Sequence, residues 1–399
     1  MLNSDLLESA RAISDRIVSL RRAIHAEPEL GLQTPRTIAK VREALANLPL
    51  EWREGGATSG AVATLRGAKP GRRVLLRGDM DALPMDEHTG LDFASATPGR
   101  MHACGHDTHT AMLAGAVELL CQRREELAGE VQFMFQPGEE GFHGARHMLD
   151  DGLISPLPEA AFALHIMPNA RHGAVAGRAG PLMASADQFD IVIEGRGGHA
   201  SMPHDTLDPV PAACAVVGAL QAMVTRRFNA AGAVVVTVTM IEAGTAHNVI
   251  PDRVTLRGTI RTLTPRFRDT VHQLIAETAQ GVAAGYGVRA DVTVTDGFPV
   301  TVCDPRAVAL GRAVVAEKLG PESWIELADP IMGAEDFSYL LEQVPGAMFF
   351  LGVAAEGEGY RTAPSIHNSK MFVDEAALPR GSALLAGCAL RFLERGFAD

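Results

Sequence analysis

The sequence has few aromatic residues and no long uninterrupted apolar segment. Its 399 residues include 15 Phe but only 3 Tyr and 2 Trp, so few rings are available to build a stacking pocket for a ligand. No run reaches the roughly 18 apolar residues that a membrane-spanning helix needs. Residues 1–30 carry charges throughout and lack an apolar core followed by a small-residue cleavage site, so we expect no signal peptide.

Cysteine and clustered positive charge are scarce as well. Five cysteines at wide, irregular spacing favour a reducing cytoplasm and argue against a disulfide framework. The formal net charge is −12 at pH 7 and the basic residues are scattered, so we expect neither nucleic acid nor a membrane as a partner. The chain also lacks internal repeats, low-complexity segments and a phosphate-binding glycine motif.

The chain is long enough for two domains. Its 399 residues exceed one ordinary core, and 47% hydrophobic with 21% charged residues is typical of a globular protein. Residues 74–76, 131–135 and 161–166 are short apolar runs typical of buried strands, whereas residues 108–127 have helical spacing. This part of the chain predicts an α/β domain. Further helices are expected at 4–24, 36–48, 307–319 and 376–393, and a further strand at 347–352.

The pattern changes near Pro181. Residues 188–194, 234–240 and 254–260 alternate apolar with polar side chains, which is typical of antiparallel strands with one solvated face. A helix is expected at 209–224, between the first two of these strands. Together these elements predict an α+β domain of about 110 residues, inserted into the α/β chain.

One stretch, residues 77–109, concentrates groups that bind metals or transfer protons. Asp79 and Asp81 follow a buried strand at its carboxyl end, where α/β sheets bind their ligands. Five more such groups then fall within eight positions: His102, Cys104, His106, Asp107 and His109. Imidazole beside thiolate suits a borderline transition metal, so the stretch predicts a metal site. A cysteine hydrolase with Cys104 as nucleophile is the local alternative.

Two later strands also end in polar groups. Glu139 and Glu140 follow one of them, and His165 lies at the end of the next. Alone, the acids could form a solvated bend and the histidine a satisfied core residue. Beside a Cys/His cluster, all three become candidate residues of the metal site. Neighbouring acids point in different directions, so one can bind metal while the other acts as a base on bound water.

Loops elsewhere present further polar groups. His199 lies on a glycine-rich turn, and Asn248 precedes a strand that carries Arg261. These features could equally be turn-shaping residues and surface charges. We expect His25 to be a packing or hydrogen-bonding residue rather than a ligand. His367 lies in a loop near the end of the chain.

Taken in order, these motifs resemble those of a known family. The motifs are HAEPELG, RGDMDALP, MHACGHD, FQPGEEG, GRGGHAS, AHNVIPD, MGAEDFS and IHN, and they span nearly the whole chain. The resemblance is to the metal-dependent amidohydrolases that include hippurate hydrolases, aminoacylases and plant auxin-conjugate hydrolases, within the dinuclear-zinc exopeptidases. It implies a zinc-exopeptidase-like catalytic domain with a mixed, largely parallel sheet, and a smaller inserted dimerisation (lid) domain with an antiparallel sheet. The expected boundaries are 1–181 and 294–399 for the former and 182–293 for the latter.

The resemblance also implies the residues of the metal site. Two divalent metal ions would be held by Cys104, His106, Glu140, His165 and His367, with the Cys104 thiolate bridging. Glu139 would be the general base, and Asp81 would orient a ligand. His102, Asp107 and His109 would shape the loop or support the ligands. Many relatives have His where this chain has Asp79 and Asp where it has Cys104, so the Cys-containing subgroup is the better match. The metal could be zinc, manganese, cobalt or nickel.

Other implied residues contact the substrate. His199, reaching across from a partner subunit, would stabilise the oxyanion. Asn248 and Arg261 would hold the substrate carboxylate, and Gly333 would contribute a backbone group. This implies a homodimer or a dimer of dimers. An aromatic pocket could be lined by Met183, Phe337 or Phe142.

The implied reaction is hydrolysis of N-acyl amino acids to a carboxylic acid and an amino acid. The acyl group could be benzoyl, indoleacetyl, acetyl or a longer chain. A dipeptidase or carboxypeptidase on the same metals is the alternative. A metal-binding protein without activity would be expected to have lost the base or a ligand, and none is missing from the sequence.

Overall fold

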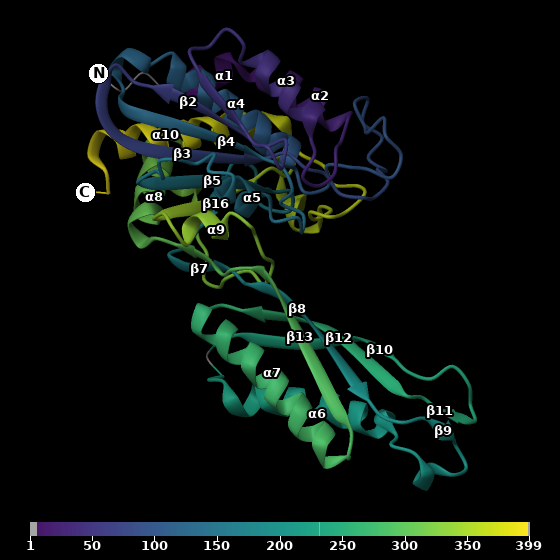
Figure 1. Ribbon diagram of the computed structural model, residues 1–399. Helices are drawn as coiled ribbons and strands as arrows, with labels where there is room; N and C mark the ends of the chain where they lie inside the picture. Colours follow the sequence, from purple (N-terminus) through teal and green to yellow (C-terminus); the bar gives the residue numbers. More distant parts are fainter. Residues whose placement is uncertain (1–5, 231, 398–399) are drawn as a thin grey trace. The chain divides into compact units, whose positions relative to one another are not determined.

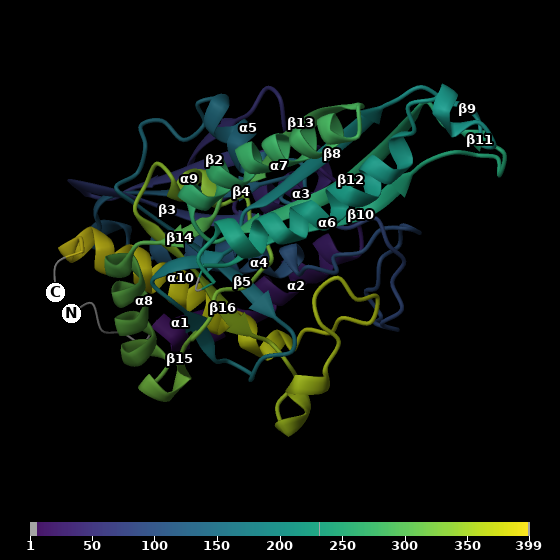
Figure 2. The same ribbon diagram turned by 90° about the horizontal axis from the view of Figure 1, so that it is seen from below.

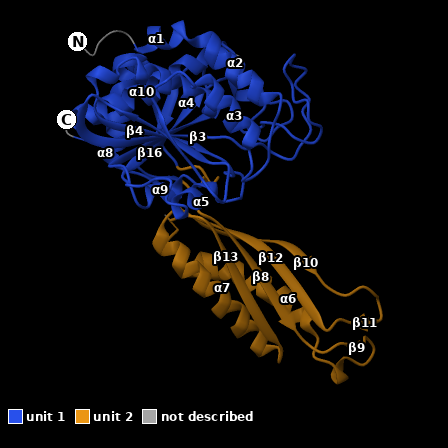
Figure 3. Ribbon diagram, turned by 45° about the horizontal axis from the view of Figure 1, so that its top comes forward, with its two compact units in different colours: residues 1–182, 302–329, 336–399 blue, residues 183–301, 330–335 orange. Residues whose placement is uncertain are grey.

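The computed structural model describes residues 6–230 and 232–397, and they form two compact units (Figure 3). Unit 1 comprises residues 1–182, 302–329 and 336–399, and unit 2 comprises residues 183–301 and 330–335. The expectation that these parts serve catalysis and dimerisation, respectively, stays a prediction.

Unit 1 is built on an eight-stranded sheet with the order β1-β2-β4-β3-β5-β16-β6-β15 (Figure 1). Its strands are β1 (Glu51–Glu54), β2 (Ala61–Arg66), β3 (Lys69–Asp79), β4 (Ala128–Gln136), β5 (Ala160–Met167), β6 (Val175–Gly177), β15 (Trp324–Glu326) and β16 (Gly346–Gly352). The central strands β4, β3, β5 and β16 are mutually parallel, whereas β1, β2 and β6 introduce antiparallel pairs. The predicted mixed, largely parallel sheet is therefore confirmed. Strand β16 is buried along its whole length, which explains its continuous apolar sequence.

Helices cover this sheet. They are α1 (Leu6–Ala12), α2 (Ser14–His25), α3 (Pro35–Ala44), α4 (His106–Cys121), α5 (Gly144–Asp150), α8 (Pro305–Lys318), α9 (Ser338–Leu341) and α10 (Leu378–Arg395), with short 3-10 turns at η1 (Arg124–Glu126), η3 (Pro321–Ser323), η4 (Glu358–Thr362) and η5 (Glu375–Ala377). Helices α4 and α10 pack on each other and on β3, β4 and β5. The single helix predicted at 4–24 is divided into α1 and α2 at Ile13. Helix α4 begins two residues earlier than predicted, so it includes His106.

Unit 2 is an antiparallel sheet covered by two helices. The sheet has the order β10-β12-β8-β13 and contains β8 (Ala186–Glu194), β10 (Val234–Glu242), β12 (Arg253–Thr262) and β13 (Arg289–Phe298). Helices α6 (Pro209–Arg227) and α7 (Pro265–Gly285) lie side by side on it (Figure 1, Figure 2). A separate ribbon pairs β9 (Gly198–His199) with β11 (Val249–Ile250), next to η2 (Pro203–Asp205). Another ribbon, made mostly of unit 1 residues, pairs β7 (Gly180–Met183) with β14 (Thr301–Cys303). The predicted inserted antiparallel sheet is confirmed.

The core of unit 2 lies between its sheet and its helices. Phe189 and Ile191 of β8 are fully buried there, against Val216 of α6 and Ile275 of α7. Among the described residues, one helix, α6, is long and apolar enough to span a membrane by length and composition alone. Its buried residues pack in this core, which accounts for its apolar face.

Candidate metal centre

The carboxyl ends of β3, β4 and β5 bring the predicted groups together. Asp79 ends β3, Glu139 and Glu140 follow β4, and His165 lies near the end of β5. Because these strands are parallel neighbours, their carboxyl ends meet at one edge of the sheet. Residues separated by up to 86 positions therefore become neighbours there.

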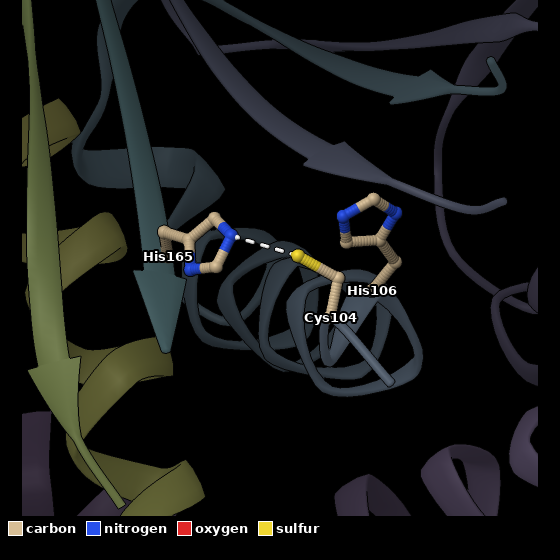
Figure 4. Close-up of side chains that lie close together, drawn as sticks. All are labelled: Cys104, His106 and His165. Atoms are coloured by element: carbon tan, nitrogen blue, oxygen red, sulfur yellow. Dashed lines mark hydrogen bonds between the residues drawn. The ribbon is translucent and has the colours of Figure 1, made fainter. Parts of the chain in front are cut away.

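Cys104, His106 and His165 form one potential ligand set (Figure 4). The Cys104 Sγ lies 3.4 Å from Nε2 of His165, and all three residues are buried. Cys104 and His106 flank Gly105, which caps α4 with a φ of 82°. A Cβ at this position would also lie 2.5 Å from the Ile166 side chain, so the turn that presents the two ligands requires glycine.

Cys104, Glu140 and His367 form a second potential set. The His367 Nε2 lies 3.3 Å from the Cys104 Sγ and 3.3 Å from Oε1 of Glu140. His367 has a φ of 61°, and its backbone N–H donates to Ala103 O at 2.7 Å, which ties the C-terminal loop to the Cys104 loop. Left-handed backbone at a non-glycine residue is strained and persists where surrounding structure enforces it. The two sets share Cys104, as a bridging thiolate would require.

The donor atoms fit a pair of divalent ions. In each set the three potential ligand atoms lie within 4.8 Å of one another. Neither ring nitrogen of His106 makes a hydrogen bond within the described chain, although the ring is buried. Carboxylate oxygens lie 3.4–3.9 Å from these nitrogens without forming hydrogen bonds, and a metal ion would satisfy such a buried polar group. Thiolate, imidazole and carboxylate together suit zinc and the neighbouring divalent metals.

Protonation in the metal-free cluster is consistent with this assignment. Hydrogen bonds with Cys104 and Glu140 raise the pKa of His367 to about 10. Burial raises the pKa of the Cys104 thiol. Burial also acts to raise the pKa of Glu140, but the hydrogen bond from His367 and the charge of His106 outweigh it and lower this pKa. In the metal-free cluster, Cys104 and His367 therefore keep their protons, and metal binding is expected to release them.

Asp81 holds the turn that carries the two glutamates. Its Oδ1 accepts from the backbone N–H of Glu139 at 2.9 Å, and its Oδ2 accepts from that of Glu140 at 3.0 Å. The same carboxylate lies 3.4 Å from Nδ1 of His106. Glu139 is nearly buried, with its Oε2 3.9 Å from Nε2 of His106. Asp81 thus orients both glutamates, and Glu139 lies beside the ligand sets.

A competing set, Asp79 with His106 and His109, has close ligand atoms but no free carboxylate. Asp79 accepts hydrogen bonds from Arg77 and from His109. Burial would raise the pKa of Asp79, but the charge of Arg77 holds it well below its usual range. Asp79 is therefore a buried structural anion.

A buried ionic cluster surrounds Asp107, which follows the proposed ligand His106 in the sequence. Asp107 Oδ2 accepts from Nε of Arg21 at 2.7 Å and from Nδ1 of His25 at 2.8 Å. The other ring nitrogen of His25 lies 3.2 Å from Glu87. His25 is thus a hydrogen-bonding residue, as expected. The sequence analysis did not single out Arg21, although a charged residue beside Ile17, Leu20 and Ile24 on the apolar face of α2 is a usable signal.

The substrate-contacting residues predicted from the resemblance lie in unit 2. His199 pairs with Val249 in the β9–β11 ribbon, and Ala200 N donates to Asn248 O at 3.0 Å, so His199 and Asn248 are neighbours. Arg261 lies at the far end of β12, where Ala184 N donates to Gly333 O at 2.9 Å and Ser185 N donates to Thr262 O at 2.9 Å. The relation of all four to the metal ligands stays a prediction.

The predicted aromatic lining needs a correction. Phe337 is fully buried, with the guanidinium carbon of Arg77 5.8 Å from its ring centroid, so it does not line an open pocket. Phe142 is 48% exposed and belongs to the loop of Glu139 and Glu140. Phe142 therefore remains the aromatic candidate in unit 1, and Met183 belongs to unit 2.

Known proteins match nearly the whole chain. The model of Peptidase family M20/M25/M40 matches residues 75–391. Thermostable carboxypeptidase 1 of Saccharolobus solfataricus is 38% identical over 97% of this chain and 98% of its own. IAA-amino acid hydrolase ILR1-like 2 of Arabidopsis thaliana is 37% identical over 98% of this chain and 89% of its own.

A solved structure agrees with these matches. The crystal structure of the Bacillus subtilis YXEP protein, a dinuclear metal binding peptidase from the M20 family, has a TM-score of 0.84 and 35% identity, covering 96% of this chain and 99% of that one. The family expected from the motifs is confirmed. The chain belongs to Peptidase family M20/M25/M40 and is a metal-dependent hydrolase.

Proposed function

We propose that the protein hydrolyses the amide bond of N-acyl amino acids and releases a carboxylic acid and an amino acid. The observation that carries the proposal is the pair of ligand sets that share Cys104, with Glu139 beside them. Cys104, His106 and His165 would hold one ion, and Cys104, Glu140 and His367 the other. Such a metal pair, when bound, supplies an activated water and polarises the scissile carbonyl.

Glu139 is the proposed general base. Its backbone is fixed by Asp81, and its carboxylate Oε2 lies 3.9 Å from Nε2 of the proposed ligand His106. In this position it takes a proton from the attacking water and passes it to the leaving nitrogen. Proton transfer by a positioned group typically contributes about 10²–10⁴-fold to the rate.

The substrate-binding residues divide between the two ends of unit 2. His199 and Asn248 lie beside the start of β12, whereas Arg261 and Gly333 lie at its other end. At about 3.3 Å per residue, the eight steps from Arg253 to Arg261 span about 26 Å. One small substrate cannot contact both ends of the same unit 2.

We therefore place His199 and Asn248 in the site of a partner subunit, and Arg261 and Gly333 in the site of their own. His199 stabilises the oxyanion, and Arg261 binds the substrate carboxylate. A homodimer follows, alone or as a dimer of dimers. The exposed Met240 and Ile241 of the edge strand β10 support such an association.

Mixing two inactive variants tests this arrangement. Glu139→Gln removes the base and His199→Ala removes the oxyanion donor, each from every site of its own homodimer. In a mixed dimer one site regains both groups, so co-expression should restore about a quarter of wild-type activity. No restoration in dimers shown by mass spectrometry to be mixed would refute the shared site.

The relatives leave a second candidate reaction. One match is named a carboxypeptidase, and a dipeptidase or carboxypeptidase would use the same ligands. After chelation and refilling with Zn²⁺, Mn²⁺, Co²⁺ or Ni²⁺, the protein should cleave at least one of N-benzoylglycine, N-acetyl amino acids and an indoleacetyl conjugate. Cleavage of dipeptides alone would favour the peptidase instead, and activity indifferent to chelation would favour Cys104 as a nucleophile.

We further propose that the enzyme works in the cytoplasm. All five cysteines are free, in agreement with a reducing compartment.

A further inference from the structure

We infer that His109 is a positioning residue that sets the ligand His165 by bridging the parted ends of strands β3 and β5. The inference rests on the proposed metal function. It concerns a residue that the motif analysis assigned only to loop shaping or support.

The strands β3 and β5 separate before they reach the metal site. Their paired residues run from Val74 with Ala160 to Arg77 with Ala163. Beyond this point the ladder stops, although β3 continues to Asp79 and β5 to Met167. The backbone N–H of Ile166 therefore has no partner in β3, and such a buried group needs another acceptor.

The imidazole of His109 provides this acceptor. Its Nε2 accepts from the backbone N–H of Ile166 at 2.9 Å, and its Nδ1 lies 2.6 Å from Oδ1 of Asp79. Since a backbone N–H can only donate, Nε2 carries no proton, and the ring proton is on Nδ1 and is donated to Asp79. The ring is buried, and Asp79 is itself held by Arg77.

This bridge reaches His165 through the next residue. The carbonyl oxygen of Ile166 lies 2.7 Å from Nδ1 of His165, which therefore donates to it. The lone pair of His165 is then on Nε2, which faces the Cys104 Sγ at 3.4 Å. His109 also packs against His165, with ring centroids 4.5 Å apart. Arg77, Asp79, His109 and Ile166 thus form one continuous support for the ligand nitrogen.

The same contacts exclude His109 as a ligand. Both of its nitrogens are engaged, one as donor and one as acceptor, so neither lone pair is available to a metal ion. Partners that fix the orientation of a ligating imidazole typically change metal affinity by about 10–100-fold when they are removed. We expect an effect of this size for the contact to Ile166.

Two substitutions separate the two contacts of the ring. In His109→Gln the amide oxygen can reach the position of Nε2 and accept from Ile166. In His109→Asn the shorter side chain can donate to Asp79 from the position of Nδ1 but leaves the Ile166 N–H without an acceptor. His172→Asn is the matched control, because His172 also lies in unit 1 but its ring contacts Ala354 O at 3.0 Å and Asp374 at 3.5 Å.

The readouts are Co²⁺ affinity and the absorption spectrum of the Co²⁺-substituted protein, including its thiolate charge-transfer band. The Asn variant should bind Co²⁺ about 10–100-fold more weakly and show an altered spectrum. The Gln variant and the control should stay within about threefold of wild type and keep its spectrum. Wild-type affinity and spectrum in both His109 variants would overturn the inference, and so would equal losses in both. A wild-type protein that binds Co²⁺ without a thiolate band would instead refute the proposed metal site.

A measurement on the wild-type protein tests the bridge even if the His109 variants do not fold. In ¹⁵N-labelled wild-type protein, the Ile166 amide should show scalar coupling across its hydrogen bond to Nε2 of His109. The absence of that coupling in an assigned spectrum would contradict the bridge.

Discussion

The two units present their polar residues in opposite ways. In unit 1, Cys104, His106 and His165 are buried and converge within a few ångströms, and His165 is held by a further hydrogen bond to Ile166 O. In unit 2, His199 and Asn248 are exposed on a two-stranded ribbon. The difference fits the proposed division of roles, in which unit 1 holds the metal ions at preorganised candidate ligands and the ribbon contacts a partner subunit. Four predictions test this comparison, from the largest effect to the smallest.

Removing the base should have the largest effect. Glu139→Gln is expected to keep its metal content, because Glu140 and the other ligands remain, and to lose about 10²–10⁴-fold in kcat. Metal analysis and steady-state kinetics of the same preparation provide the check. Activity within about tenfold of wild type would show that Glu139 is not the base.

Removing the histidine of the ribbon should affect catalysis without affecting the metal site. His199→Ala is expected to lower kcat by about 10²–10³-fold, the typical effect of losing an oxyanion donor, with metal content unchanged. His204, an exposed histidine in the same loop, offers the matched control His204→Ala. An unchanged kcat for the His199 variant would place the ribbon outside the site.

Arginines of the two units should differ in their effect on stability. Arg77 is buried and donates to Gln136, Asp79 and Asp336, so Arg77→Met leaves buried acids uncompensated and should cost about 3–5 kcal/mol. Arg257 of unit 2 pairs with Asp190 and Glu242 at the surface, and Arg257→Met should change stability little. Urea unfolding of the wild type and of both variants measures their free energies of unfolding. Similar losses in Arg77→Met and Arg257→Met would contradict the expected difference.

The buried ionic cluster around Asp107 should make stability depend on pH. Burial lowers the pKa of His25, but Asp107 and Glu87 outweigh it and raise this pKa to about 9. Because the folded-state pKa exceeds the unfolded value of about 6.5, the contribution is complete below pH 6.5 and disappears as the pH rises through 9. Over this window, metal-free wild-type protein should lose up to about 3 kcal/mol more than metal-free His25→Gln, which keeps the contribution of His367. Parallel pH profiles of the two proteins would contradict the assignment.

The sequence predicted which candidate ligands come together better than it predicted what supports them. His165 lies near the end of a buried strand and Glu140 follows another, so parallel neighbours bring them to one sheet edge, near Cys104 in the loop before α4. The bridge formed by His109 could not be found, because it depends on where β3 and β5 stop pairing. The burial of Phe337 was likewise not predicted, because it depends on tertiary packing that local sequence does not determine.

In unit 2 the alternating strands β8, β10 and β12 were predicted, but β13 and α7 were not assigned. The apolar spacing of Val271, Leu274, Ile275 and Ala279 in α7 was a usable signal for that helix. The division of substrate residues between the two ends of β12 required the strand register, which local sequence does not determine.

The central claim is that Cys104 joins two ligand sets into one dinuclear site. The most direct test is to titrate chelated protein with Co²⁺ while recording bound ions per chain, the thiolate absorption band and hydrolysis of the preferred N-acyl amino acid. The account predicts two bound ions, a thiolate band, and loss of the band in Cys104→Ser. One bound ion, or a band that survives the substitution, would contradict it.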